Sequence, residues 1–104
     1  MVNAQKLIEI ASYFKIIHHI QGRIRVRVNP KIKEQGGNIS IKDIEELSKK
    51  IDGIKHIKIN KIIGSVTIEY NHTIFPETLW EDLIARRNLE EIAGIINIHA
   101  REVM

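Results

Sequence analysis

A strict alternation of apolar and charged residues in the first third of the chain is its clearest structural signal. Residues 23–28 read Arg-Ile-Arg-Val-Arg-Val, which is the two-residue period of a β-strand with one face buried. The β-like stretch begins near Ser12, and Gly22 interrupts it as a bulge or a tight turn. Pro30 ends it because proline offers no N–H to a sheet. We therefore expect isoleucine and valine to face the core and the arginines to face solvent.

Helical periodicity marks three further segments. A short helix is expected over residues 2–11, and a longer one runs from an N-cap at Ser40 to Gly53. Pro76 suits the first turn of a third helix. The apolar stripes of the last two helices are Ile41, Ile44, Leu47 and Ile51, and Leu79, Trp80, Leu83 and Ile84.

The end of the chain allows two interpretations. Asn88 and Glu91 have the spacing of a helix capping box, so residues 88–104 are expected to form a C-terminal helical segment. The alternative is a short edge strand over residues 95–98.

The order of the elements predicts the fold class. Alternating apolar residues over 54–59 and 66–70, joined by a Gly-Ser turn, mark a β-hairpin. Strand, helix, strand, strand, helix is an α+β fold of the ferredoxin-like split βαβ type, βαββα(β), with helices on one face of an antiparallel sheet. We expect one domain over residues 1–104 with its core at about 12–86. A missing fourth strand would leave a sheet edge for the N-terminal segment, the last helix or another chain to cover, which makes a homodimer a reasonable expectation.

Three stretches carry a resemblance to a known family. Residues 19–28, 53–60 and 64–70 resemble, in order and spacing, the strands of a cysteine-less branch of heavy-metal-associated (HMA)-like domains, over residues 14–86. The resemblance implies a ferredoxin-like module in metal homeostasis, active in metal or heme handling. In that family a Cys-x-x-Cys loop after the first strand holds the metal. This chain has no cysteine, and residues 29–39 contain no Cys, His or Met, so no metal-ligand role is carried over.

Composition narrows the class of protein. With 104 residues, 43% hydrophobic and 28% charged, the chain has the make-up of an ordinary globular domain. No apolar run approaches the roughly 18 residues that span a bilayer, so no membrane insertion is expected. The first residues lack the features of a signal peptide, which makes the cytoplasm the expected compartment. No catalytic triad spacing or phosphate-binding glycine loop is present, so we expect no enzyme.

Histidines are the candidate ligands for a metal ion or heme. His18 or His19, together with His56 on a neighbouring strand, has the imidazole chemistry that binds zinc, copper, nickel or heme iron. In a regular strand His18 and His19 point to opposite faces, so one pocket takes both only if the region near Gly22 is irregular. The alternative is that these histidines are polar surface residues.

A basic patch is the second candidate site. Arg23, Arg25 and Arg27 are expected to share the open sheet face with His56 and Lys58. Arginine binds phosphate and carboxylate through its fork of donors, and the formal charge of +3 permits acidic partners. Docking of an acidic protein surface, binding of phosphate or nucleic acid, and plain solvation all stay open. Nucleic acid is less favoured than protein, because this face lacks the aromatic residues on which RNA-recognition sheets stack bases.

Three functions are compatible with these features. The leading one is a non-catalytic binding module that acts in metal or heme handling by protein contact or self-association. The first alternative is a histidine-based metal or heme binder. The second is a nucleic-acid or phosphate binder that uses the basic sheet face. The residues themselves identify neither the partner nor a cofactor, because fold does not imply function.

Overall fold

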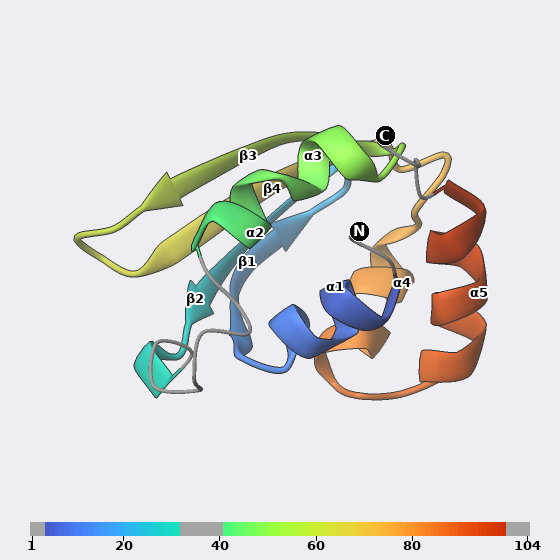
Figure 1. The fold of residues 1–104 in the computed structure, drawn as a ribbon, viewed down its shortest axis with the longest axis horizontal. Helices are drawn as coiled ribbons and strands as arrows, with labels where there is room; N and C mark the ends of the chain where they lie inside the picture. The colour runs from blue at the N-terminus through green and yellow to red at the C-terminus, as the bar shows by residue number, and fades with distance from the viewer. Residues whose placement is uncertain (1–3, 32–40, 100–104) are drawn as a thin grey trace.

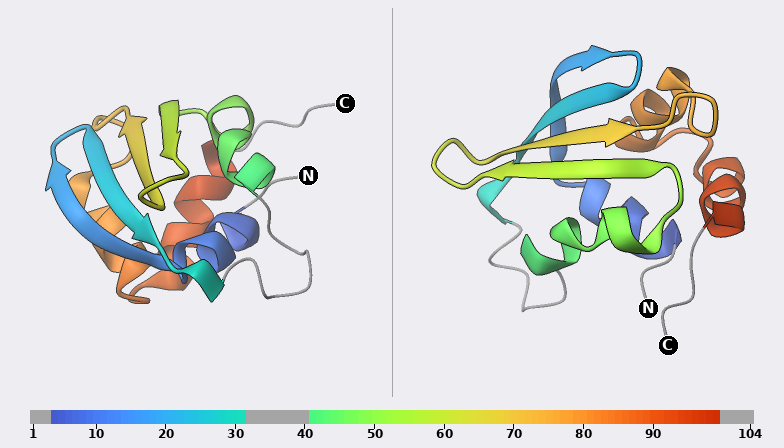
Figure 2. Two further views of the ribbon diagram at one scale, coloured as in Figure 1. Left: turned by 90° about the vertical axis from the view of Figure 1, so that its left-hand side faces the viewer. Right: turned by 90° about the horizontal axis from the view of Figure 1, so that it is seen from above.

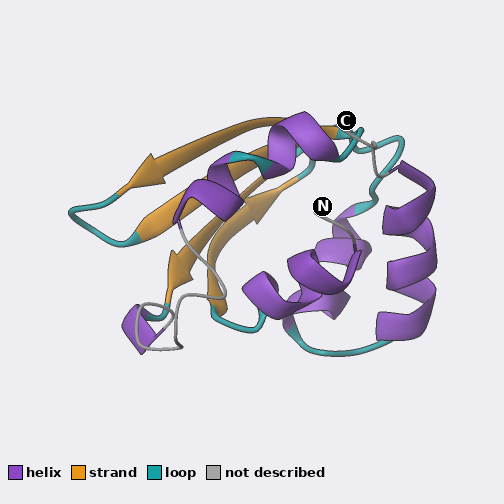
Figure 3. Ribbon diagram, viewed as in Figure 1, coloured by secondary structure: helices purple, strands orange, loops and turns teal. Residues whose placement is uncertain are grey.

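The computed structural model of the protein describes residues 4–31 and 41–99 (Figure 1). These residues form, in order, α1 (Ala4–Ala11), β1 (Phe14–Ile20), β2 (Arg23–Val28), α2 (Ile41–Glu45), α3 (Leu47–Lys50), β3 (Ile54–Asn60), β4 (Ser65–Tyr70), α4 (Glu77–Ile84) and α5 (Leu89–His99). The strands make one antiparallel sheet in the order β1-β2-β4-β3. The helices lie on one side of this sheet (Figures 1 to 3). The predicted α+β class with helices on one face of an antiparallel sheet is confirmed.

The first β-like stretch is a hairpin of two strands, β1 and β2. Its turn contains Gly22, whose φ of +88° is a conformation that glycine adopts easily and other residues rarely do. Of the two alternatives expected at Gly22, a bulge or a tight turn, the tight turn is confirmed. The predicted order of elements, however, counted this stretch as one strand and missed β1. β1 pairs with the edge of β2 that a fourth strand of the ferredoxin-like fold would otherwise occupy. The N-terminal segment therefore covers that edge.

The last described element is a helix. Residues 95–98 lie within α5, so the alternative of a short edge strand there is wrong and the expected helix is confirmed for residues 89–99. Because β1 already covers the edge of β2, a homodimer is not needed to cover it. Self-association stays a prediction.

The hydrophobic core lies between the sheet and the helices. Ile24 and Val26 of β2 are fully buried while the arginines that alternate with them are exposed, so the expected orientation of this strand is confirmed. Trp80 on α4 packs against Tyr70 and Phe75, with ring centroids 5.2 and 6.1 Å away respectively. These three rings join β4, the loop that follows it and α4 into one packed unit.

The helix expected from Ser40 to Gly53 is in fact two short helices, α2 and α3. The second one ends at Lys50 because Ile51 is already extended (φ −126°, ψ 117°), which places its side chain in the core. Ser40, the expected N-cap, lies outside the described residues. None of the helices in residues 4–31 and 41–99 combines the length and the apolar character that crossing a bilayer requires.

The capping box expected at the start of α5 does not form as predicted. Asn88 does precede the helix, but its side-chain amide donates a hydrogen bond of 3.2 Å to a carboxylate oxygen of Asp82 on α4. Its φ of +52° also differs from the extended conformation of an ordinary N-cap. The side chain of Asn88 therefore joins α4 to the start of α5 instead of pairing with Glu91.

Two glycines provide a matched test of this backbone. Gly53 has a φ of +99°, and a Cβ there would lie 2.7 Å from a ring carbon of Phe75, whereas a Cβ on Gly94 in α5 would meet open space. We expect Gly53→Ala to lower the free energy of unfolding by about 2 kcal/mol, and Gly94→Ala to raise it by about 0.5–1 kcal/mol. Urea unfolding measures both changes. Equal effects of the two substitutions would contradict the described turn at Gly53.

Candidate functional site

The sheet face turned away from the helices, which we call the open face, is the candidate interaction surface. Strand pairing arranges its side chains in three rows that cross β1, β2, β4 and β3 in turn. The rows are Ile20–Arg23–Glu69–His56, His18–Arg25–Thr67–Lys58 and Lys15–Arg27–Ser65–Asn60. The three arginines of β2 therefore form a line along the middle of the open face, with His56 and Lys58 on the far strand β3.

The open face is strongly basic. Its cationic residues, all exposed, are Lys15, Arg23, Arg25, Arg27 and Lys58. Glu69, which lies opposite Arg23 in the register, is the one carboxylate in the three rows. No ion pair within 4 Å joins these five cations to a carboxylate of the described residues. The excess of positive charge is therefore available to an approaching anionic surface.

The three predicted histidine ligands do not come together. His18 and His56 both lie on the open face, but on the two edge strands, which are three strand spacings or about 14 Å apart. The side chain of His19 is on the opposite, helix-covered side and is only 4% exposed. Residues 4–31 and 41–99 hold no group of three or more His, Cys, Asp or Glu side chains that could bind one metal ion.

A β-bulge decides which of the two adjacent histidines is buried. The pairing of β1 with β2 shifts by one residue between Ile16 and His18, so Ile17 is the extra residue of the bulge. Strict alternation from the inward-facing Ile16 would turn His18 inward. Because Ile17 is inserted, His19 pairs opposite the buried Ile24 and turns inward instead.

His19 connects three elements through its two ring nitrogens. Nε2 lies 2.7 Å from the hydroxyl of Tyr70 on β4, and Nδ1 lies 3.2 Å from a carboxylate oxygen of Glu81 on α4. A neutral imidazole satisfies both contacts when Nδ1–H donates to Glu81 and Nε2 accepts the proton of the Tyr70 hydroxyl. Sequence reasoning missed this cluster, since its members are 51 and 62 residues apart and follow no motif.

The environment of this cluster also changes the acidity of Tyr70. Burial raises the pKa of the Tyr70 phenol above its usual 10.0, the backbone of Gly22 opposes the rise, and the carboxylates of Glu77 and Glu81 add to it. The phenol therefore stays protonated at neutral pH and can donate to His19. The cluster links β1, β4 and α4 as a structural contact inside the domain.

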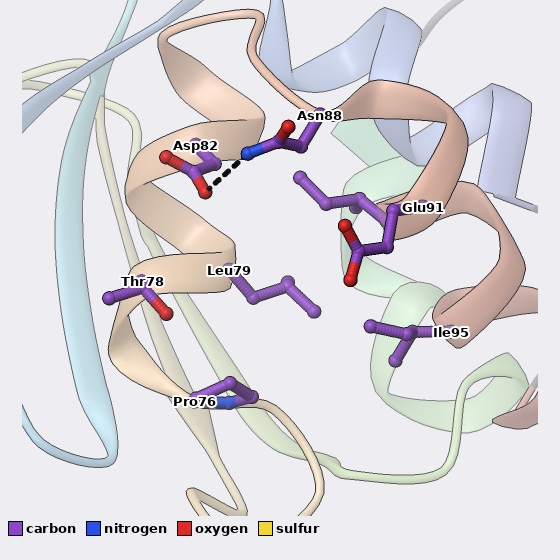
Figure 4. A pocket seen from close by; sticks show the side chains of 8 residues that line it. Pro76, Thr78, Leu79, Asp82, Asn88, Glu91 and Ile95 are labelled. Carbon is purple, nitrogen blue, oxygen red and sulfur yellow. Dashed lines mark hydrogen bonds between the residues drawn. The ribbon is translucent and has the colours of Figure 1, made fainter.

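A small hollow lies between α4 and α5 (Figure 4). Its volume is about 130 Å³, which is below the range of about 300–1,000 Å³ usual for small-molecule sites. Asp82, on its wall, is already bonded to Asn88 and forms an ion pair of 3.2 Å with Arg87. Imperfect packing of the two helices therefore explains this hollow better than a cofactor site does.

Comparison with known proteins identifies the family. The family model of heavy metal associated domain 2 matches residues 5–100, which is nearly the whole chain. The chain belongs to the heavy metal associated domain 2 family. No curated protein and no solved structure matches it. The predicted resemblance to HMA-like domains is thus confirmed, and the match extends beyond residues 14–86 to nearly all of α1 and the whole of α5. The protein is a small metal-associated domain without cysteine.

Removal of the Tyr70 hydroxyl tests the buried cluster of this HMA domain. We expect Tyr70→Phe to lower the free energy of unfolding at neutral pH by about 1–2 kcal/mol, because Nε2 of His19 loses its partner. The matched control is Tyr13→Phe, at a half-buried tyrosine directly before β1. It should change the free energy of unfolding little. Urea unfolding of the three proteins gives the comparison.

The same variants carry a prediction about alkaline pH. Because the pKa of Tyr70 is raised in the folded state, the stability linked to its proton is fully present below about pH 10 and is lost as the pH rises further. The wild type should therefore lose more stability than Tyr70→Phe between neutral pH and pH values above 10. Parallel curves for the two proteins would contradict the shifted pKa.

Proposed function

We propose that this protein is a non-catalytic interaction module that acts in metal or heme handling by contact with a protein whose surface is acidic. Family membership supports the association with metals. The observation that supports contact is the line of exposed arginines along the open face, none of them in an ion pair with the described residues. The metal or heme is then held by the partner, with this chain as the docking surface.

The chemistry of the open face favours a carboxylate-bearing protein over nucleic acid. Arginine forks bind carboxylates with two parallel hydrogen bonds, and residues on alternate positions of one strand hold them at a regular spacing. Sheets that bind RNA add aromatic rings on which bases stack. The phenylalanine, tyrosine and tryptophan residues of this chain lie elsewhere: four are buried in the core and one is half-buried beside β1, namely Phe14, Tyr70, Phe75, Trp80 and Tyr13.

The role of this charge lies in speed and selectivity of association. Exposed cations attract an acidic partner over distances up to about 8–10 Å at ordinary salt, which raises the association rate. Each exposed pair adds little affinity by itself, at most about 1 kcal/mol. Such a surface therefore suits a transient contact whose affinity falls as salt increases.

Charge reversal on the open face tests the docking role. We expect Arg23→Glu/Arg25→Glu to weaken capture of the partner from a cell extract at least about tenfold, because like charges would then face each other. The matched control is Lys42→Glu/Lys49→Glu, which makes the same change of net charge on exposed lysines of α2 and α3. Quantitative mass spectrometry of the captured proteins, followed by calorimetry with the recovered partner, measures the difference.

The two variants separate specific docking from general charge effects. If the helix control weakens capture as much as the open-face variant does, net charge decides binding and the open face has no special role. Unchanged capture by the open-face variant would refute the docking proposal outright.

Ligand retention tests the proposal that the partner holds the metal. Because His18, His19 and His56 are dispersed, we expect native mass spectrometry to show no stoichiometric adduct when zinc, copper or heme is added to the purified protein. A bound ion or heme that disappears in His18→Ala/His56→Ala would overturn this and favour the histidine-based alternative. His72→Ala is the control histidine, on the loop after β4.

A further inference from the structure

The tip of the β3–β4 hairpin presents two isoleucines to solvent. Ile62 is 98% exposed and Ile63 is 50% exposed, and neither packs against the hydrophobic core. The hairpin extends away from the helices, so its tip is the part of the described sheet farthest from α5 (Figures 1 and 2). An isolated exposed isoleucine is common, but two in succession at a projecting point make a small apolar surface without a partner in the described residues.

The turn that carries these isoleucines is held by hydrogen bonds. The side-chain oxygen of Asn60 accepts from the backbone N–H groups of Ile62 and Ile63, each at 3.1 Å. The N–H of Gly64 donates to the carbonyl of Asn60 at 2.8 Å, and Gly64 has a φ of +77°. A further bond of 2.8 Å runs from the N–H of Val28 to the carbonyl of Gly64. The apolar tip is therefore pre-organised, and little entropy is lost when it meets a surface.

Positive charge surrounds the tip. Lys61 is exposed beside the two isoleucines, and Arg27 lies in the row of the open face nearest the turn, between β1 and the start of β4. Lys58 lies in the next row. Glu69, the one acidic residue between residues 54 and 70, lies in the row at the opposite end of the sheet. The hairpin thus has an apolar point with cations directly behind it.

We propose that the hairpin tip docks on an anionic lipid surface. Ile62 and Ile63 enter the boundary between headgroups and acyl chains, while Lys61, Arg27 and Lys58 contact the phosphates of the headgroups. A convex, projecting apolar point fits a fluid surface, which needs no matching pocket, and the cations behind it lie where the headgroup charge is. This contact lies on the membrane and requires no spanning helix. The two isoleucines take no part in the protein contact proposed above, whereas Arg27 and Lys58 also belong to the open face that serves it.

Vesicle binding of the full chain tests this proposal. We expect the wild type to sediment with phosphatidylcholine vesicles that contain phosphatidylserine, and to do so far less with phosphatidylcholine alone or at high salt. Ile62→Ser/Ile63→Ser should bind the anionic vesicles at least about tenfold more weakly than the wild type does. Ile98→Ser, which removes an isoleucine that is 78% exposed on α5, is the matched control and should bind as the wild type does.

A single label can report which part of the molecule enters the lipid. Because the chain has no cysteine, Ile62→Cys and Ile98→Cys each create one attachment site for an environment-sensitive fluorophore. Contact through the tip predicts a blue shift of the label at position 62 on anionic vesicles and none at position 98. Both substitutions are at exposed positions, so we expect the fold to be retained, which circular dichroism checks.

Three outcomes would overturn the proposal. One is the absence of sedimentation with anionic vesicles at low salt. Another is equal binding by the wild type and Ile62→Ser/Ile63→Ser, which would show that the isoleucines are not the contact. The third is that Ile62→Ser/Ile63→Ser no longer captures the acidic protein partner while the wild type does not bind vesicles. That result would assign the tip to the protein interface.

Discussion

The burial of Ile24 and Val26 against the helices is the constraint on which the rest of the molecule depends. Successive side chains of a strand point to opposite faces, so burying these two residues turns the arginines of β2 outward. Because β2 is an inner strand, the arginines line the middle of the open face and not its rim. A slip of one residue would bury unpaired guanidinium groups, which is far too costly to occur. The basic face is thus a consequence of the core.

β1 completes this arrangement from the N-terminal side. It covers the free edge of β2, and its bulge at Ile17 turns His19 inward to meet Tyr70 and Glu81. One of the two adjacent histidines thereby becomes a structural link between the sheet and α4, while His18 remains on the open face. The bulge at Ile17 and the hydrogen bonds of His19 together hold β1 against the rest of the domain.

Functionally, the molecule combines the scaffold of a heavy metal associated domain with surfaces that bear no thiolate chemistry. The open face offers ordered positive charge, and the hairpin tip offers a rigid apolar point beside it. Both surfaces involve the β3–β4 hairpin. Its turn forms the tip, and its strand β4 pairs with β2, which carries the arginines. The described residues thus carry an exposed basic face and an exposed apolar tip, and the chain has no cysteine.

The sequence by itself determined the orientation of β2, the β3–β4 hairpin, α4 with its buried Trp80, and the absence of a cysteine site. Each of these follows from local periodicity or composition, which act over a few residues. The tertiary structure alone decided the place of β1, the partners of His19 and the exposure of Ile62. It also decided that two short helices, α2 and α3, replace the single helix expected from Ser40 to Gly53. These depend on which distant segments meet: a bulge reverses the facing of every later residue in its strand, and an apolar residue in a turn is exposed only if no other element covers it.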